Sequence, residues 1–238
     1  MVQTDTLVLG EGNKAIGSFG NVAITAGQVV GRGTGSTDLQ SPTTLATVRL
    51  GGDSGARQTL NGGAGTLALT STTPAQPLPA SSGLGASWTL NAGAIAFDTA
   101  ADLASGALAL NASTGDVALG ANANINVAGR SVAFFDETRG TAGGTVALTS
   151  ANGNVVLDAA SRVNVSGAAG ADGGTLQVNA VKGTATLAAG NLIGQAPADA
   201  AGQAGEGARA RIDVGSLANA TARSAALHSG GFTGERTL

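Results

Sequence analysis

The densest group of chemically active side chains near the middle of the chain is Asp136, Glu137 and Arg139. Carboxylates beside a basic group could hold Ca²⁺ or carry out acid–base chemistry on a polysaccharide. The other available carboxylates are not spaced so that they would converge on one outward face. A charge run of this kind is usually a solvated loop, so we expect no catalytic site. The other acidic residues considered are Asp98, Asp102, Asp116 and Asp158.

Metal-binding motifs are weak in this sequence. The run from Gly167 to Gly174 is similar to one copy of a Ca²⁺-binding nonapeptide, which needs tandem copies because one turn supplies only half of the ligands. His228 is the only histidine, and no second ligand lies near it in the sequence. Because cysteine is absent, disulfides and thiolate sites are excluded. We therefore expect no metal, no cofactor and no enzyme activity.

Aromatic side chains offer the best candidate for ligand contact. Phe134, Phe135 and Trp88 could form a platform for glycan stacking, although large rings in a thin β fold more often fill the interior. Strand alternation should bury at least one of the two phenylalanines. Their segment is the least repeat-like part of the middle region, and loops on a fixed scaffold often carry recognition. The expected ligand-contact loop consists of Arg130, Phe134, Phe135, Asp136, Glu137 and Arg139.

A repeated segment indicates the architecture that positions these residues. Residues 106–129 and 144–167 align without a gap at an offset of 38, with 10 of 24 positions identical. A third copy begins at Gly174, at an offset of 30. Such repeats indicate coils that stack and bury their apolar side chains against their neighbours. The sequence therefore predicts an all-β fold, a right-handed parallel β-helix of roughly eight to ten coils that advances ~4.8 Å per coil.

Each coil is expected to hold three short strands and three turns. Val117 and Leu119 should point inward and stack on Val155 and Leu157. Asparagines at equivalent positions could form hydrogen-bonded ladders along the axis, and the candidates are Asn124, Asn126, Asn164 and Asn179. Alternating apolar residues between turns predict strands at 21–25, 47–50, 66–70, 87–91, 94–97, 107–111, 116–119, 124–127, 131–135, 145–149, 154–158, 162–166, 175–179 and 184–188.

The chain divides at about residue 195. Residues 1–195 should form the β-helix, with loop excursions at about 32–44, 72–85 and 130–141. Residues 196–238 should form an Ala/Gly loop, a strand at 211–214 and a short helix at 216–227 that lead into further repeats. Ser216 could cap the helix, and Gly230–Gly231 would end it. Neither end resembles the polar cap of a solenoid, which suggests an internal segment of a longer protein.

The composition excludes several classes of function. The formal net charge is −3 and no basic stripe exists, which argues against nucleic acid binding. No apolar stretch approaches about 20 residues, so no membrane insertion is expected. The first 30 residues lack the charged region and apolar run of a signal peptide. Few aromatic residues (3%) and many glycines (39) suit a narrow core with frequent turns.

The segment GNVVLDAASRVNVSGAAGADGGTLQVNA resembles the repeats of filamentous haemagglutinin-like exoproteins, which are large surface adhesins of Gram-negative bacteria. The final IDVGSLANATARSAALHSGGFTGERTL is similar to a recurring non-repeat element in some of them. The resemblance covers roughly Gly65–Leu238. Autotransporter passengers have repeats of the same general pattern. It implies a right-handed parallel β-helix, secretion to the bacterial cell surface, and an outer-membrane transporter partner that acts on an N-terminal domain outside this chain.

The expected function is that of a structural and adhesive shaft segment. Such a segment presents binding regions to host cells or other bacteria, and its receptor would be a host-cell glycan or protein. Two alternatives come from other classes: the stalk of a contact-dependent toxin delivery exoprotein, and a polysaccharide-acting β-helix enzyme. The shaft and the stalk are built from the same repeats, so this chain does not separate them.

Overall fold

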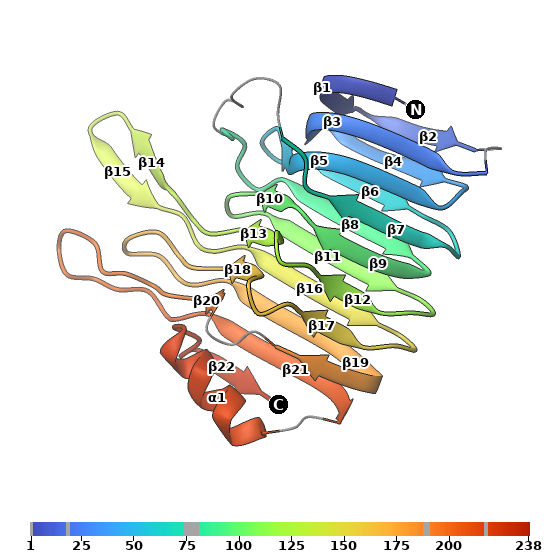
Figure 1. Cartoon of the computed structure of the whole chain (residues 1–238). Coiled ribbons are helices and arrows are strands. Elements are labelled where there is room, and N and C mark those ends of the chain that lie inside the picture. The colour runs from blue at the N-terminus through green and yellow to red at the C-terminus, as the bar shows by residue number, and fades with distance from the viewer. Residues whose placement is uncertain (1, 18–19, 74–80, 188–190, 217–218) are drawn as a thin grey trace.

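The computed structural model describes the whole chain except residues 1, 18–19, 74–80, 188–190 and 217–218. The chain winds into a parallel β-solenoid whose strands stack from the N-terminal to the C-terminal coil (Figure 1). All strands of the long sheet pair in parallel, and β1 to β7 each pair with the strand two places further along the chain. The predicted β-helix is therefore confirmed.

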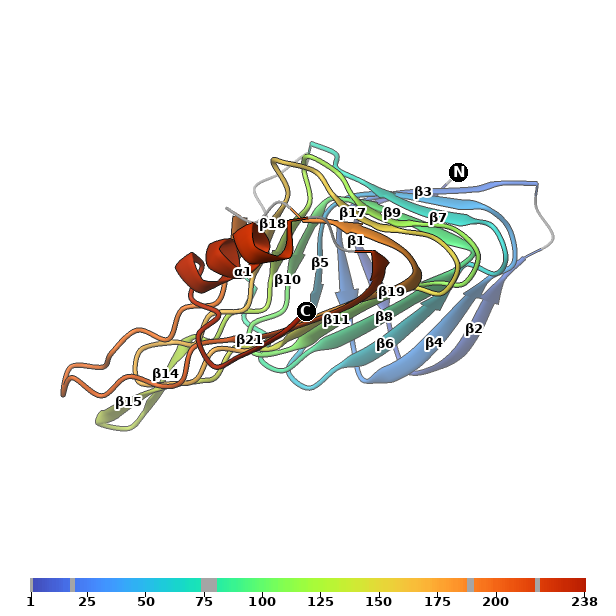
Figure 2. The same cartoon turned by 90° about the horizontal axis from the view of Figure 1, so that it is seen from below.

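The strands lie on three faces of the rod, which Figure 2 shows along its axis. The first face stacks β1 (Val2–Leu9), β3 (Val22–Gly31), β5 (Thr43–Gly52), β7 (Thr66–Thr70), β9 (Ala94–Asp98), β12 (Val117–Leu119), β17 (Val155–Leu157) and the end of β19 (Thr175–Thr186). The second face stacks β2 (Gly12–Ile16), β4 (Thr34–Leu39), β6 (Arg57–Asn61), β8 (Ser87–Ala92), β11 (Ala107–Ala112), β16 (Thr145–Ser150), β19, β21 (Arg209–Ser216) and β22 (Glu235–Thr237). The third face stacks the end of β5, β10 (Ala100–Asp102), β13 (Asn124–Asn126), β18 (Arg162–Asn164) and β20 (Leu192–Ile193).

The register of the stack follows the sequence repeat. Ala107 pairs with Thr145 and Val117 with Val155, at the predicted offset of 38. Thr145 then pairs with Thr175, at the predicted offset of 30. The coil from β8 to β11 needs only 20 residues. Coil length therefore varies in the connections, while the paired strands keep their register.

The core is a narrow column of aliphatic side chains between the three faces. Val117, Leu119, Val155 and Leu157 point inward with at most 3% of their surface exposed, as predicted. Trp88 is also buried, and its indole N–H donates to the carbonyl of Gly51 (3.0 Å) within the core. Successive coils bury the same columns, so each coil depends on both of its neighbours for burial.

One predicted excursion is wrong. Residues 32–44 contain β4 and the start of β5, which pair on both sides with the coils before and after them. The inward positions of β4 are held by Thr37 and Leu39, both buried. A threonine at an inward position hides the apolar alternation, so the segment reads as a polar loop in sequence. The excursion at 72–85 lies partly outside the described residues, and 81–85 form no strand.

Several strands were not predicted at all. They are short or polar, and their positions follow from pairing with neighbouring coils rather than from local alternation. The strands that the sequence pattern does not predict are β1, β2, β4, β6, β10, β15 (Glu137–Gly140), β20 and β22.

The asparagine ladder forms at Asn61, Asn91 and Asn111, and of the predicted residues only Asn179 lies in the same column. Asn126 and Asn164 lie in register, but each amide oxygen accepts from a backbone N–H two residues further along its own chain (3.3 and 3.0 Å). Asn124 pairs with Ala100 and Arg162, so no asparagine lies next to it. A polar column does run along the second face, and it consists of Asp38, Asn61, Asn91, Asn111, Thr149, Asn179 and Asp213.

The helix α1 (Ala220–Ser229) begins later than predicted. Ser216 is the last residue of β21 and pairs with Thr184, so it is not the helix cap. Asn219 precedes the helix in a left-handed conformation and makes no side-chain cap bond, while Gly230 ends the helix as predicted. Leu227 and Phe232 are fully buried, so α1 covers part of the last coil (Figure 1).

Both end coils place a cation at an inward position. Lys14 lies in register with the buried Thr37, and its ammonium donates to the carbonyls of Gly10 (2.6 Å), Glu11 (2.9 Å) and Gly12 (3.1 Å). Arg236 in β22 lies in register with the buried Ala210.

Candidate functional site

The excursion at 130–141 is a β-hairpin that projects from the rod. β14 (Ser131–Phe134) pairs antiparallel with β15 (Glu137–Gly140) in a separate two-stranded sheet. The hairpin leaves the solenoid between β13 and β16, at the corner where the third face meets the second (Figures 1 and 2). The predicted excursion is confirmed here, and β14 belongs to it rather than to a coil.

The tip of the hairpin exposes an aromatic ring. Phe135 is 107% exposed and has a φ of 52°, in the left-handed region that favours glycine or asparagine. Holding a bulky residue there costs about 1 kcal/mol. The expectation that aromatic rings fill the interior is correct for Trp88 and wrong for Phe135. The side chain of Phe134 lies outside what the structure describes.

The charged residues of the hairpin lie on its surface. Arg139 and Glu137 form an ion pair at 3.1 Å, with side chains 69% and 60% exposed. Exposed pairs of this kind contribute little to stability. Asp136 is exposed beside the aromatic tip. The hairpin therefore combines one apolar tip with a mixed polar flank.

Arg130 has a positioning role at the base of the hairpin. Its guanidinium donates to the carbonyls of Ser81 (3.4 Å) and Ser82, which belong to the 72–85 excursion. The structure thus brings two of the predicted excursions together, with an arginine of one donating to the backbone of the other. Arg130 is committed to this contact, whereas Phe135, Asp136, Glu137 and Arg139 are exposed.

Thr141 closes the hairpin base and was not identified from sequence. Its hydroxyl accepts from the Arg130 N–H (2.9 Å) and lies 2.7 Å from the hydroxyl of Ser105 in the preceding coil. Its backbone N–H donates to the Arg130 carbonyl (3.0 Å). The only signal for this residue in the sequence is its place at the end of the insertion.

The hairpin is the first of three stacked excursions, which we call the fin (residues 129–143, 166–173 and 195–206). Backbone bonds join them: Gly129 donates to Ser166 (2.8 Å), and Gly170 donates to Pro197 (2.8 Å). The Asp172 carboxylate accepts from the Glu206 N–H (2.8 Å). The glycine run 167–174 is therefore part of a stacked support for the hairpin, which local sequence did not indicate.

The hairpin base gives a testable prediction. Thr141→Val removes the hydroxyl but keeps the shape of the side chain, so the hairpin should become more mobile while the solenoid stays folded. We expect amide exchange in β14 and β15 to accelerate about tenfold, and the free energy of unfolding to fall by about 1 kcal/mol. Hydrogen exchange measured by NMR checks this. Thr138→Val, on the exposed part of the same hairpin, is the control, and equal exchange in both variants would contradict the assigned role.

The carboxylates considered for catalysis hold turns. Asp98 accepts from the Asn122 N–H (2.8 Å), Asp116 from the Asn154 N–H (2.7 Å) and Asp158 from the Ala160 N–H (2.8 Å). Asp102 accepts from the Asn126 amide (3.3 Å). Within the described ranges, no three acidic, histidine or cysteine side chains gather in a way that could hold a metal ion.

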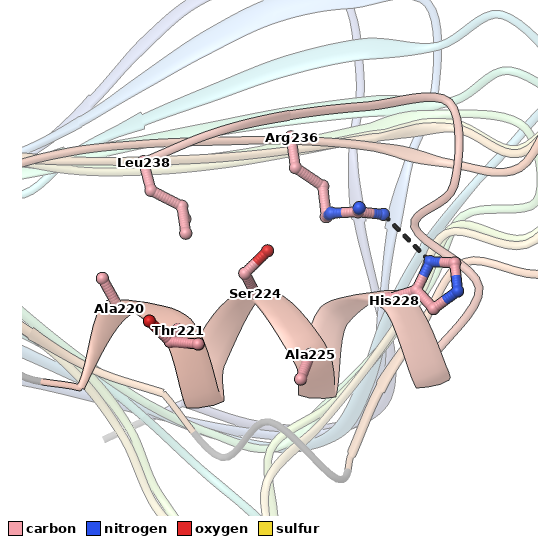
Figure 3. A pocket seen from close by; sticks show the side chains of 7 residues that line it. All are labelled: Ala220, Thr221, Ser224, Ala225, His228, Arg236 and Leu238. Atoms are coloured by element: carbon pink, nitrogen blue, oxygen red, sulfur yellow. Dashed lines mark hydrogen bonds between the residues drawn. The ribbon is translucent and has the colours of Figure 1, made fainter.

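His228 lies at the end of α1 beside an open pocket of about 590 Å³ (Figure 3). Its Nδ1 accepts from the guanidinium of Arg236 (3.1 Å), which also donates to the Phe232 carbonyl (2.6 Å). His228 is exposed, and its contact with Arg236 joins α1 to β22. The pocket lies between these two elements at the end of the core.

The fold defines a parallel β-solenoid with a lateral fin of stacked excursions. No family model, curated protein or solved structure matches this chain. In the part of the chain that the structure describes, no helix has the length and apolarity needed to cross a membrane.

Proposed function

We propose that this chain is a structural and adhesive shaft segment that presents the β14–β15 hairpin to a surface receptor. The observation that carries the proposal is Phe135, a fully exposed ring held at a positive φ on the tip of a projecting hairpin. Buried aromatic anchors dominate the energetics of many interfaces, and strained exposed residues cluster at binding sites. A glycan or protein pocket on a host cell or another bacterium would receive this ring.

The rest of the molecule is suited to presenting the β14–β15 hairpin. The solenoid is a continuous stack of paired strands, and contacts of Arg130 and Thr141 fix the hairpin base. A preorganised loop loses less conformational entropy when it binds. Secretion to the bacterial cell surface and export through an outer-membrane transporter belong to the same proposal, and they rest on the resemblance to filamentous haemagglutinin-like exoproteins.

Removing the ring tests the proposal. Phe135→Asn deletes the aromatic anchor and places a residue that tolerates positive φ, so the hairpin should keep its shape. We expect saturable binding of the parent chain to epithelial cells or to a glycan array, and binding about tenfold weaker or worse for the variant. The free energy of unfolding should be unchanged or slightly higher.

The control removes an exposed apolar side chain elsewhere. Val156→Asn changes a residue that is 36% exposed on the first face, far along the chain from the hairpin tip. Its binding should match that of the parent chain. Equal binding by the Phe135 variant, or no saturable binding by the parent to either target, would overturn the proposal.

A further inference from the structure

A ladder of side-chain amides runs along the second face. Asn61 donates to Asp38 (2.6 Å), Asn91 donates to Asn61 (2.9 Å) and Asn111 donates to Asn91 (2.9 Å). The residues lie at matching positions of successive strands, so the amides repeat at the strand spacing of ~4.8 Å. The column continues through Thr149 in the next coil. All three asparagines are half-buried, so one side of each amide faces solvent.

The ladder leaves hydrogen-bonding capacity unused. An asparagine amide has two N–H donors and two acceptor lone pairs. Asn91 uses one N–H toward Asn61 and one lone pair toward Asn111, which leaves one donor and one acceptor. Asn111 uses one N–H in the ladder. Asn61 uses both of its N–H groups, toward Asp38 and Ser36 (3.3 Å). The rod therefore presents a row of uncharged amides in which Asn91 and Asn111 can still both donate and accept.

This row forms one wall of a groove of about 410 Å³, which we call the amide groove. The buried Ala92 and Ala112 and the exposed Ala151 also line it. Each described residue that lines the groove is uncharged. The volume falls in the range of about 300–1,000 Å³ that is typical of ligand sites. The groove lies at the opposite end of the second-face strands from the fin, because the hairpin precedes β16 and Thr149 lies near its end.

We propose that the amide groove binds a neutral polysaccharide chain laid along the rod axis. Sugar hydroxyls both donate and accept, which matches the unused capacity of the amides, and the apolar face of a sugar ring can pack on alanine. A polyanion is disfavoured because no cation lines the groove. An extended peptide rises ~3.3 Å per residue and would not match a row spaced ~4.8 Å apart. The hydroxyls of a sugar project from several sides of each ring, so a polysaccharide can bond to the amides without having the same repeat length as the row.

Titration calorimetry with defined oligosaccharides tests this site. The probes are cellohexaose, maltohexaose, laminarihexaose and dextran, with heparin and an uncharged Gly/Ser peptide for comparison. We expect at least one neutral glycan to bind, and Ala151→Glu to weaken its binding by about tenfold because the larger side chain fills the groove. Asn111→Leu, which keeps a side chain of similar size without the amide, should weaken it by about fivefold or more.

A matched control separates groove filling from added charge. Ala159→Glu makes the same substitution at an exposed turn after β17, and it should bind within about twofold of the parent. Phe135→Asn should also leave glycan binding in this groove unchanged, so this site and the hairpin proposal can fail separately. Undiminished binding by Ala151→Glu, binding of none of the neutral glycans, or binding of heparin or the peptide alone would overturn the inference. Thermal unfolding of each variant confirms that it is folded.

Discussion

Replacing Leu157 with aspartate is expected to lower the free energy of unfolding by about 4 kcal/mol, a large fraction of the stability of an ordinary domain. Leu157 is 3% exposed, and it stacks on Leu119 of the preceding coil. The substitution removes a buried aliphatic side chain and places a carboxylate where no partner is available. Urea unfolding followed by circular dichroism measures the change.

The neighbouring residue provides the control. Val156 lies in the same strand, points outward and is 36% exposed, so Val156→Asp should change the free energy of unfolding by no more than about 0.5 kcal/mol. Together the two variants test the inward and outward assignment of β17. Equal destabilisation in both would show that this assignment is wrong.

The second large effect is expected for Gly144→Ala. Gly144 precedes β16 at the corner where the fin leaves the rod, and its column contains Gly106 and Gly174 in the neighbouring coils. A Cβ at Gly144 would lie 1.9 Å from the carbonyl oxygen of Gly106, which accepts from the Thr145 N–H (2.9 Å). Because the colliding atom is a backbone oxygen that is hydrogen-bonded to the next coil, the coils would have to separate. We expect a loss of about 3 kcal/mol in the free energy of unfolding, measured by urea titration.

Gly10→Ala is the matched control for this glycine. Nothing lies within 4 Å of a Cβ at Gly10, so alanine fits without a clash. Alanine also reduces the conformational freedom of the unfolded chain, which can raise stability by about 0.4–1 kcal/mol. If Gly144→Ala were as stable as Gly10→Ala, the close approach of the two coils would be refuted.

Sequence predicts the fold best where apolar residues repeat. Val117 with Val155, and Leu119 with Leu157, define the inward columns, and these pairs give the register of the coils directly. The prediction fails where inward residues are polar, as at Thr37 in β4, because the alternation is then invisible. It also fails for the asparagines: Asn126 and Asn164 have the right spacing for a ladder, but the amide oxygen of each accepts from its own turn, and the Asn126 amide donates to Asp102 rather than to an asparagine.

The sequence predicted the position of the candidate site but not the conformation or the contacts of its residues. Loss of the repeat located the 130–141 insertion, which is the projecting hairpin. Sequence alone favoured burial of its aromatic residues, since no local pattern indicates that Phe135 occupies the tip at a positive φ. The roles of Arg130 and Thr141 depend on contacts with Ser81, Ser82 and Ser105, which lie in other coils. Such contacts exist only after the coils stack.

The variable length of the coils has a mechanical consequence. The inter-strand backbone bonds run along the rod axis, so tension between the two ends opens them in sequence, as in a zipper, and one coil at a time leaves the stack. Each freed residue adds up to ~3.4 Å of chain. The coil from β8 to β11 releases 20 residues, whereas the coil that carries the hairpin releases 38. The excursions therefore determine how much length each opening step yields, and the rod can absorb a pull by lengthening in unequal steps.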